Sequence, residues 1–185
     1  PEKSLPDDGV VFLNWDDPLL REAPVSHEVI SFSLDSPDAR YQAVDITEAS
    51  NLLSFLIVDH LTGDKTAIEL NLVGRHNAYS ALTAFAIGRW LGIDSEKIAD
   101  SLSDFKPQFM RQALLDMENQ HVLVDCYNAS EASVVGSAQS LRQMHVNEGG
   151  KRVFVFGDLT NRGSQSEALH RQIGEDLASQ TPIDL

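Results

Sequence analysis

The stretch NLVGRHNAYSALTAFAIGRWLGI, residues 71–93, decides the fold expected for this chain. It predicts the end of a strand, a sharp turn at Gly74 and a long helix that is buried on most sides. His76 and Asn77 fall where the first N–H groups of a helix lack partners within the helix, which favours an anion or nucleotide site. The Asn77 carboxamide suits reading an adenine edge, whereas spacing alone favours an ordinary helix cap.

The composition predicts a soluble globular protein, because 42% of the 185 residues are hydrophobic and the formal net charge is -14. The excess of 28 acidic over 14 basic residues argues against nucleic-acid binding but leaves a nucleotide open as a small ligand. No apolar run approaches the ~20 residues needed to span a bilayer, so no membrane contact is expected. Because the chain starts at Pro1 rather than Met, we expect a piece of a longer protein.

The single cysteine, Cys126, cannot form a disulfide within the chain, which fits a reducing compartment and predicts a cytoplasmic protein. No histidine lies at a motif distance from Cys126, so we predict a buried structural thiol rather than a nucleophile. The six histidines show no metal-ligand spacing, and no metal site is expected in this chain.

Extended runs before Gly74 predict a series of strands, which cover residues 9–13, 29–33, 41–46, 52–60 and 65–72. Thr62, Gly63 and Asp64 separate the last two runs, as in a hairpin. We therefore predict an α/β core with a small antiparallel sheet appended to it.

Polar residues follow the first predicted strand, where Asn14, Asp16 and Asp17 precede Pro18. In open α/β sheets ligands bind beyond the carboxyl ends of the strands, which gives these residues a functional interpretation. The alternative is an Asx turn closed by Pro18, which the sequence favours when it is taken without context.

A linker over residues 104–108, with Pro107, divides the chain into residues 1–106 and residues 107–185. In the second part we predict a hairpin of residues 112–117 and 121–125, a helix over 131–145 and a strand over 152–156. Ser164 and Glu167 form a predicted capping box for a last helix. This β-α-β-α order predicts a parallel sheet.

Polar clusters in the second part are further candidates for a site. Arg111 follows the linker, Asp125, Tyr127 and Asn128 follow one predicted strand, and Asp158 follows another. The alternatives are that Asp125 and Asn128 cap the next helix and that Asp158 lies in a plain turn.

Four motifs together resemble those of one family. They are Asn-x-Asp-Asp-Pro at 14–18, Gly-x-His-Asn at 74–77 with Leu-Gly-Ile at 91–93, Asp-x-Tyr-Asn-Ala at 125–129, and Gly-Asp at 157–158 with His170. Across residues 9–176 their order and spacing are similar to those of the Mur ligases, ATP-dependent amide-forming enzymes of peptidoglycan precursor synthesis. The branch most resembled adds D-alanyl-D-alanine to UDP-N-acetylmuramoyl-tripeptide.

The resemblance implies that residues 1–106 are the rear part of a central ATP-binding domain and that residues 107–185 are the front part of a Rossmann-like C-terminal domain. It implies a nucleotide-binding set of His76, Asn77, Ser80, Arg111, Asp125 and Asn14. It implies an amine-substrate set of Tyr127, Asn128, Ser133 and Asp158. The implied cofactors are ATP and Mg²⁺, with the catalytic residues and metal ligands upstream of Pro1. The implied partners are a nucleotide-sugar peptide and a D-amino-acid dipeptide, bound by a monomeric full-length protein.

The chain departs from the family pattern at several positions. Ser80 and Ser130 stand where the family has Asn, Asn161 with Arg162 replaces Glu-Leu, and no Gly-x-x-x-x-Gly-Lys-Ser/Thr phosphate loop is present. We expect this piece alone to lack ligase activity. Two alternatives remain: a degenerate Mur ligase-like scaffold protein, and a relative of folylpolyglutamate synthase, which the segment 127–129 disfavours. A phosphate loop upstream of Pro1 would support the enzyme over the scaffold.

Overall fold

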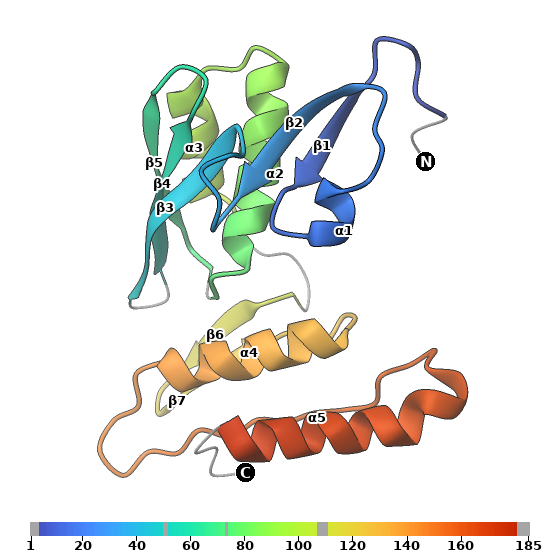
Figure 1. Cartoon of the computed structure of the whole chain (residues 1–185). Helices are drawn as coiled ribbons and strands as arrows, with labels where there is room; N and C mark the ends of the chain where they lie inside the picture. The colour runs from blue at the N-terminus through green and yellow to red at the C-terminus, as the bar shows by residue number, and fades with distance from the viewer. Residues whose placement is uncertain (1–3, 50–51, 73, 107–110, 181–185) are drawn as a thin grey trace. The chain divides into compact units, whose positions relative to one another are not determined.

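The computed structural model describes residues 4–49, 52–72, 74–106 and 111–180 (Figure 1). The chain divides into two compact units, residues 1–106 and residues 107–185, and each is described by itself. Among the described residues no helix is long and apolar enough to cross a membrane.

The first unit is built on one five-stranded sheet in the order β1-β2-β3-β4-β5. The strands are β1 (Val10–Asn14), β2 (Glu28–Ser33), β3 (Tyr41–Ala49), β4 (Leu52–Asp59) and β5 (Lys65–Leu70). β1, β2 and β3 pair in parallel, whereas β3, β4 and β5 pair antiparallel. The predicted α/β class is confirmed, and the antiparallel strands continue the parallel ones in a single mixed sheet.

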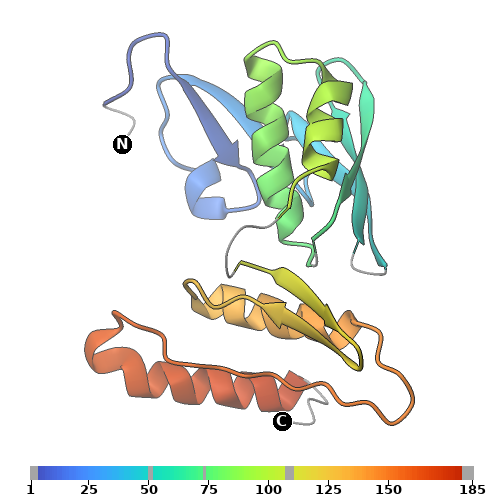
Figure 2. The ribbon, with the colours of Figure 1, turned by 180° about the vertical axis from the view of Figure 1, so that it is seen from behind.

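Helices α2 (Asn77–Trp90) and α3 (Ser95–Ser103) cover one face of this sheet (Figure 2). The burial predicted for α2 is confirmed along one side of the helix, at Ala78, Ala81, Leu82, Phe85 and Ala86. These side chains pack on alternate residues of the strands, because successive side chains of a strand point to opposite faces. The ring of Phe85 meets that of Tyr41 edge to face, with 5.5 Å between the centroids.

The C-terminal end of α2 shows where its predicted burial was too broad. Ile87, Trp90 and Leu91 are exposed, since the sheet covers one side of the helix and does not enclose its last turn. Gly92 follows the C-cap with a φ of 79°, a conformation that glycine adopts without strain. Gly92 therefore ends α2.

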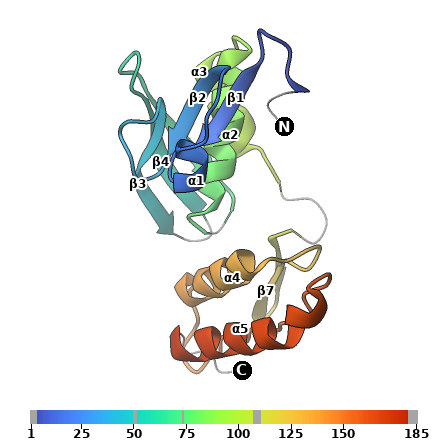
Figure 3. The same ribbon diagram turned by 45° about the vertical axis from the view of Figure 1, so that its right-hand side comes forward.

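The second unit contains the predicted hairpin and two helices that lie side by side (Figure 3). Its elements are β6 (Ala113–Met117), β7 (Gln120–Val124), α4 (Glu131–Gln143), the short 3₁₀ helix η2 (Gly163–Gln165) and α5 (Ser166–Gln180). β6 and β7 pair antiparallel. A small core of Val134, Leu159 and Ile173 joins the helices, with Phe154 and Phe156 packed against it.

Two predictions for this unit are wrong. Residues 152–156 pair with no strand in the described part of the chain, so the predicted parallel sheet is not formed there, and Val155 is 90% exposed. A parallel strand needs a neighbour whose hydrogen-bonding edge is available at the right distance, which an apolar run alone does not supply. The predicted capping box also fails, since α5 begins at Ser166 after η2 and Glu167 pairs instead with Arg171.

Candidate functional site

The carboxyl ends of the parallel strands β1 and β2 meet at one edge of the sheet. Asn14 lies opposite Phe32, and the Trp15 N–H donates to the Phe32 carbonyl at 2.8 Å. The Asn14 side-chain oxygen accepts from the Asp16 N–H at 3.1 Å. The predicted alternative of an Asx turn is therefore confirmed, and this turn places the Asp16 carboxylate beside the end of β2.

Beyond this turn the chain forms a short helix that the sequence did not predict, α1 (Pro18–Arg21). Its cap is Asp17, whose carboxylate accepts from the N–H groups of Leu19 and Leu20 at 2.9 and 3.3 Å. Proline at the first helical position needs no hydrogen bond from its nitrogen. Asp17 is thus a helix cap.

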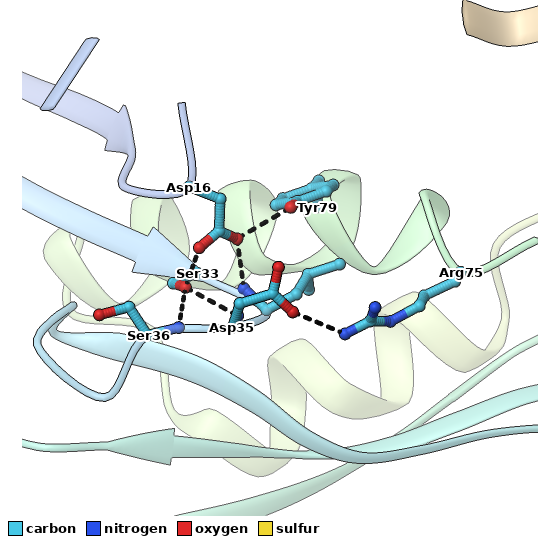
Figure 4. Close-up of polar contacts among 7 residues, drawn as sticks. Asp16, Ser33, Asp35, Ser36, Arg75 and Tyr79 are labelled. Carbon is cyan, nitrogen blue, oxygen red and sulfur yellow. Dashed lines mark hydrogen bonds and ion pairs between the residues drawn. The ribbon is translucent and has the colours of Figure 1, made fainter. Parts of the chain in front are cut away.

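The Asp16 carboxylate accepts hydrogen bonds from two other parts of the chain, the end of β2 and helix α2 (Figure 4). One oxygen accepts from the Ser33 hydroxyl at the end of β2. The other accepts from the Leu34 N–H at 2.7 Å and from the Tyr79 hydroxyl of α2 at 2.8 Å. The strand ends and the first turn of α2 are therefore held together by one anion.

Ser33 extends this network toward the turn before α2. Its buried oxygen accepts from the N–H groups of Asp35 and Ser36 at 2.9 and 2.6 Å while its hydroxyl donates to Asp16. The Asp35 carboxylate in turn forms an exposed ion pair of 3.0 Å with Arg75. We call Asp16, Ser33, Asp35, Arg75 and Tyr79 the Asp16 network.

The pKa directions agree with this geometry. Burial raises the pKa of the Asp16 carboxyl, but the hydrogen bonds from Ser33, Leu34 and Tyr79 outweigh burial, and the net shift is downward. Burial raises the pKa of the Tyr79 hydroxyl, and its hydrogen bond to the Asp16 carboxylate raises it further. The pair therefore consists of an ionised acceptor and a protonated donor at neutral pH.

The start of α2 differs from the prediction in two respects. Gly74 has the positive φ expected of the turn, 95°, but the following N–H groups are already paired. Asn77 donates to the Gly74 carbonyl at 3.0 Å, and the next two residues repeat this i to i−3 bonding. The predicted set of unpaired N–H groups is wrong because the chain enters the helix through tight 3₁₀-like turns.

The side chains around this turn remain accessible. His76 occupies the N-cap position without a side-chain cap bond, so the predicted cap role of Asn77 is wrong. Asn77 is half-buried as the first helical residue, and His76 and Ser80 are exposed. Any recognition by this turn therefore rests on side chains.

In the second unit the structure brings two predicted residues into contact. The Arg111 guanidinium lies over the Tyr127 ring, 4.3 Å from its centroid. One oxygen of Asp125 accepts from the Ser137 hydroxyl of α4 at 2.9 Å. Both residues of this unit that were predicted to bind the nucleotide, Arg111 and Asp125, thus contact neighbouring side chains.

The start of α4 is capped by a residue that the sequence did not single out as a cap. Ser130 accepts from the Ser133 N–H at 3.3 Å, and the Ser133 oxygen accepts from the Ser130 N–H at 2.8 Å. The predicted alternative of a cap by Asp125 or Asn128 is therefore wrong. Ser133 is engaged in this capping box, and Asn128 is exposed.

The loop between β7 and α4 also corrects the prediction for Cys126, which is exposed rather than buried. The residue follows the last strand residue by two positions, in a segment that leaves the sheet before α4 begins. Its thiol is therefore at the surface.

Asp158 lies on a loop that His170 of α5 fixes. The imidazole Nε2 accepts from the Leu159 N–H at 2.9 Å, and Nδ1 lies 2.7 Å from the Ser166 carbonyl, to which it donates. The ring also stacks on Phe156. The Asp158 carboxylate is 3.0 Å from Nε2 and 79% exposed, so it faces solvent beside a firmly held ring.

The described part of the chain contains no group of three or more His, Cys, Asp or Glu residues that could hold a metal ion. The site residues that the sequence missed are Ser33, Asp35, Arg75 and Tyr79. The signal was available for Ser33 and Asp35, because polar residues at the end of the second predicted strand fall at the same sheet edge as Asn14.

Two family models match the chain in succession, the Mur ligase middle domain over residues 3–88 and the Mur ligase glutamate ligase domain over residues 110–183. The chain belongs to the Mur ligase family. Its similar proteins include the UDP-N-acetylmuramoyl-tripeptide--D-alanyl-D-alanine ligases of Escherichia coli strain K12 and Bacillus subtilis strain 168. They are 33% and 30% identical, each over 92% of this chain and over 37% and 36% of their own lengths.

The fold is likewise that of a Mur ligase. A crystal structure of MurF from Acinetobacter baumannii superposes with a TM-score of 0.87 at 27% identity, over 99% of this chain and 39% of that chain. MurF from Thermotoga maritima in complex with ADP has a TM-score of 0.78 at 18% identity, over 92% of this chain and 38% of that chain, and shows the fold alone. The chain thus spans little more than a third of the Mur ligases that it resembles, and the family predicted from its motifs is confirmed.

Proposed function

We propose that the full-length protein carrying this chain is an ATP-dependent amide-bond ligase of peptidoglycan precursor synthesis. The proposed reaction adds D-alanyl-D-alanine to UDP-N-acetylmuramoyl-tripeptide. The observation that carries the proposal is the similarity to two ligases named for this reaction, at 33% and 30% identity along 92% of the chain. We further propose that the protein works as a monomer in the cytoplasm.

In the proposed reaction ATP supplies the phosphoryl group that converts a substrate carboxylate into an acyl phosphate, which the amine of the dipeptide attacks. His76 and Asn77 face the adenine, where the Asn77 carboxamide offers both a donor and an acceptor. Asn14 lies at the neighbouring strand end, where its side-chain oxygen accepts from the Asp16 N–H and its amide group is proposed to donate to the nucleotide. Ser80 lies one turn after Asn77 on the same side of α2, and it supplies a smaller polar contact.

Arg111 and Asp125 supply the contacts to phosphate and ribose. The guanidinium of Arg111 is planar and exposed; one face stacks on Tyr127, and its N–H groups are suited to binding phosphate oxygens. Asp125 uses one oxygen to accept from Ser137, which orients the other oxygen for ribose hydroxyl groups. These two residues bind the nucleotide in the proposed function.

The amine substrate is proposed to lie near Tyr127, Asn128, Ser133 and Asp158. The exposed Asp158 carboxylate attracts the ammonium group of a D-amino-acid dipeptide, and His170 holds the loop that carries it. Ser133 contributes through the capping box, which fixes the start of α4. Mg²⁺ is proposed to be bound by residues outside this chain.

The test uses the full-length protein with ATP, Mg²⁺, UDP-N-acetylmuramoyl-tripeptide and D-alanyl-D-alanine. We expect phosphate release that depends on the dipeptide, and a pentapeptide product that mass spectrometry identifies. A reaction with L-alanine in place of the dipeptide is the matched control. Absence of any product with a folded protein would rule out the ligase, and the 185-residue chain alone is expected to form none.

A second candidate, a Mur ligase fold kept for binding without catalysis, is favoured by Ser80, which offers a hydroxyl where the family has a carboxamide. The sequence upstream of Pro1 in the gene separates the two candidates. A Gly-Lys-Thr or Gly-Lys-Ser phosphate loop there supports the ligase, because its backbone N–H groups and lysine bind the phosphates. A sequence without that loop supports the scaffold.

A further inference from the structure

We propose that Asp16 is a positioning residue for the nucleotide site, which it assembles by tying the β1 end to the first turn of α2. This inference rests on the proposed function, in which Asn14 and Asn77 face the nucleotide. Asp16 lies two residues after Asn14, and its bonding partner Tyr79 lies two residues after Asn77. One carboxylate therefore sets the spacing between two segments whose bonded residues are 63 positions apart in the chain.

The bonding of Asp16 is suited to this task. Its backbone N–H donates to the Asn14 side chain, so the carboxamide and the carboxylate are oriented together. Its carboxylate then accepts from Ser33, from the Leu34 N–H and from Tyr79, which come from two further elements. A displacement of α2 relative to β1 must break one of these bonds.

The outer part of the Asp16 network is the weaker tie. The pair of Arg75 and Asp35 has side chains that are 53% and 68% exposed, and exposed ion pairs contribute little because water screens them. Ser33, by contrast, has no exposed surface, and the hydrogen bond between Tyr79 and Asp16 is partly buried. The positioning is therefore assigned to the inner bonds of Asp16.

A matched control within the same unit distinguishes a positioning role of Asp16 from a purely structural one. Tyr41 is a buried tyrosine that lies opposite an aspartate, Asp59, on the neighbouring strand. That pair lies on β3 and β4, outside the segments 14–17 and 74–80. Tyr79→Phe and Tyr41→Phe each remove one hydroxyl from a tyrosine–aspartate pair, but only the first affects the nucleotide-facing segments.

The experiment measures ADP affinity, the KM for ATP, kcat and the free energy of unfolding of the full-length protein and of the two variants. We expect Tyr79→Phe to weaken ADP binding by about five- to tenfold, the effect of reducing the binding-competent population to roughly a fifth to a tenth. The KM for ATP rises by a similar factor while kcat stays within about twofold, since the network holds the binding geometry. Tyr41→Phe lowers stability but leaves the ADP affinity unchanged.

Equal ADP affinity in Tyr79→Phe and the wild-type protein would overturn this inference and leave the proposed function intact. Absence of ADP binding by the folded wild-type protein would overturn both. A loss of affinity in Tyr41→Phe as large as that in Tyr79→Phe would reduce Asp16 to a general stabilising residue. Amide exchange without nucleotide is a second measure, and faster exchange over residues 14–17 in Tyr79→Phe alone supports the positioning role.

Discussion

Ser33 is the residue on which the Asp16 network depends most for stability, because its buried hydroxyl donates to Asp16 and accepts two N–H groups. We expect Ser33→Ala to lower the free energy of unfolding by about 2–3 kcal/mol at pH 7, since two N–H groups lose their acceptor and the Asp16 carboxylate loses one of its three donors. Urea unfolding at constant temperature measures the change. Ser101→Ala, which removes an exposed hydroxyl bonded within α3, is the control and costs less than about 0.5 kcal/mol.

The same variant has a defined pH dependence. The pKa of Asp16 is lower in the folded chain than in the unfolded one, so its contribution is present above the unfolded pKa and is lost as the pH falls through the folded pKa. Ser33→Ala removes one cause of that lowering. The difference in unfolding free energy between wild type and variant should therefore shrink between pH 7 and pH 3, and a constant difference would contradict this account.

His170 leads to a second prediction at this scale. His170→Ala leaves the N–H of Leu159 without its acceptor in the core of the second unit, and an unsatisfied group costs about 1–3 kcal/mol. We expect the melting temperature of that unit to fall, and far-ultraviolet circular dichroism, which follows the loss of helix on heating, measures the change. His145→Ala, at an exposed histidine, is the control and leaves it unchanged.

The Asp16 network shows how far single residues could be predicted. Asp16 could be predicted as a site residue because it belongs to a polar run that follows a strand. Ligands of α/β sheets bind beyond the carboxyl ends of the strands, which gave this run a functional interpretation. Tyr79 could not be predicted as a partner of Asp16, since its position relative to β1 depends on how α2 packs across the sheet. The sequence also could not show that the N–H groups after Gly74 bond to one another, because this depends on the exact turn.

At the scale of whole elements, two helical glycines make a matched pair. A Cβ on Gly174 of α5 meets nothing within 4 Å, whereas a Cβ on Gly88 of α2 lies 2.7 Å from the Ile98 Cδ1 of α3. We expect Gly174→Ala to stabilise the chain by about 0.5–1 kcal/mol through helix propensity. Gly88→Ala gains the same propensity but forces the buried Ile98 side chain to shift, and urea unfolding should show a net loss.

The contact with Ile98 can be checked directly. Ile98→Val removes the Cδ1 that the new methyl group meets, so the double variant should be less destabilised than the sum of the two single ones. Additive effects would show that the loss in Gly88→Ala has another cause.

Elements with strong periodicity were predicted well, and the failures have one physical reason. β4, β5, α2 and the hairpin of β6 and β7 follow from local patterns of alternation, turns and helical stripes. Residues 152–156 have an equally apolar pattern, but no strand pairs with them in the part of the chain that the structure describes. Strand formation needs a partner elsewhere in the chain, which a local pattern cannot report.

At the scale of the molecule, the two units differ in the size of their cores. The first unit packs buried residues from β2, β3, β4, β5, α2 and α3 into one cluster, all contributed by residues 1–106. The core of the second unit centres on three buried side chains. We expect residues 1–106 to fold alone and to unfold cooperatively in urea, because every residue of the larger cluster is retained.

Limited proteolysis of the whole chain is the companion measurement. Cleavage should begin within residues 107–185, since a smaller core opens at a lower free energy. Early cleavage inside the five-stranded sheet would contradict this order.

The family of the whole chain could be predicted because its motifs keep their order over both units, whereas the arrangement of the individual side chains required the fold.

The surface thiol of Cys126 gives the chain a practical property. It is the one cysteine among the 185 residues, and it lies between Asp125 and Tyr127 in the sequence. A maleimide dye should therefore attach at a single known position without denaturant and without an engineered residue. Its emission then becomes an optical reporter for the arrival of a ligand at that loop in the unmutated protein.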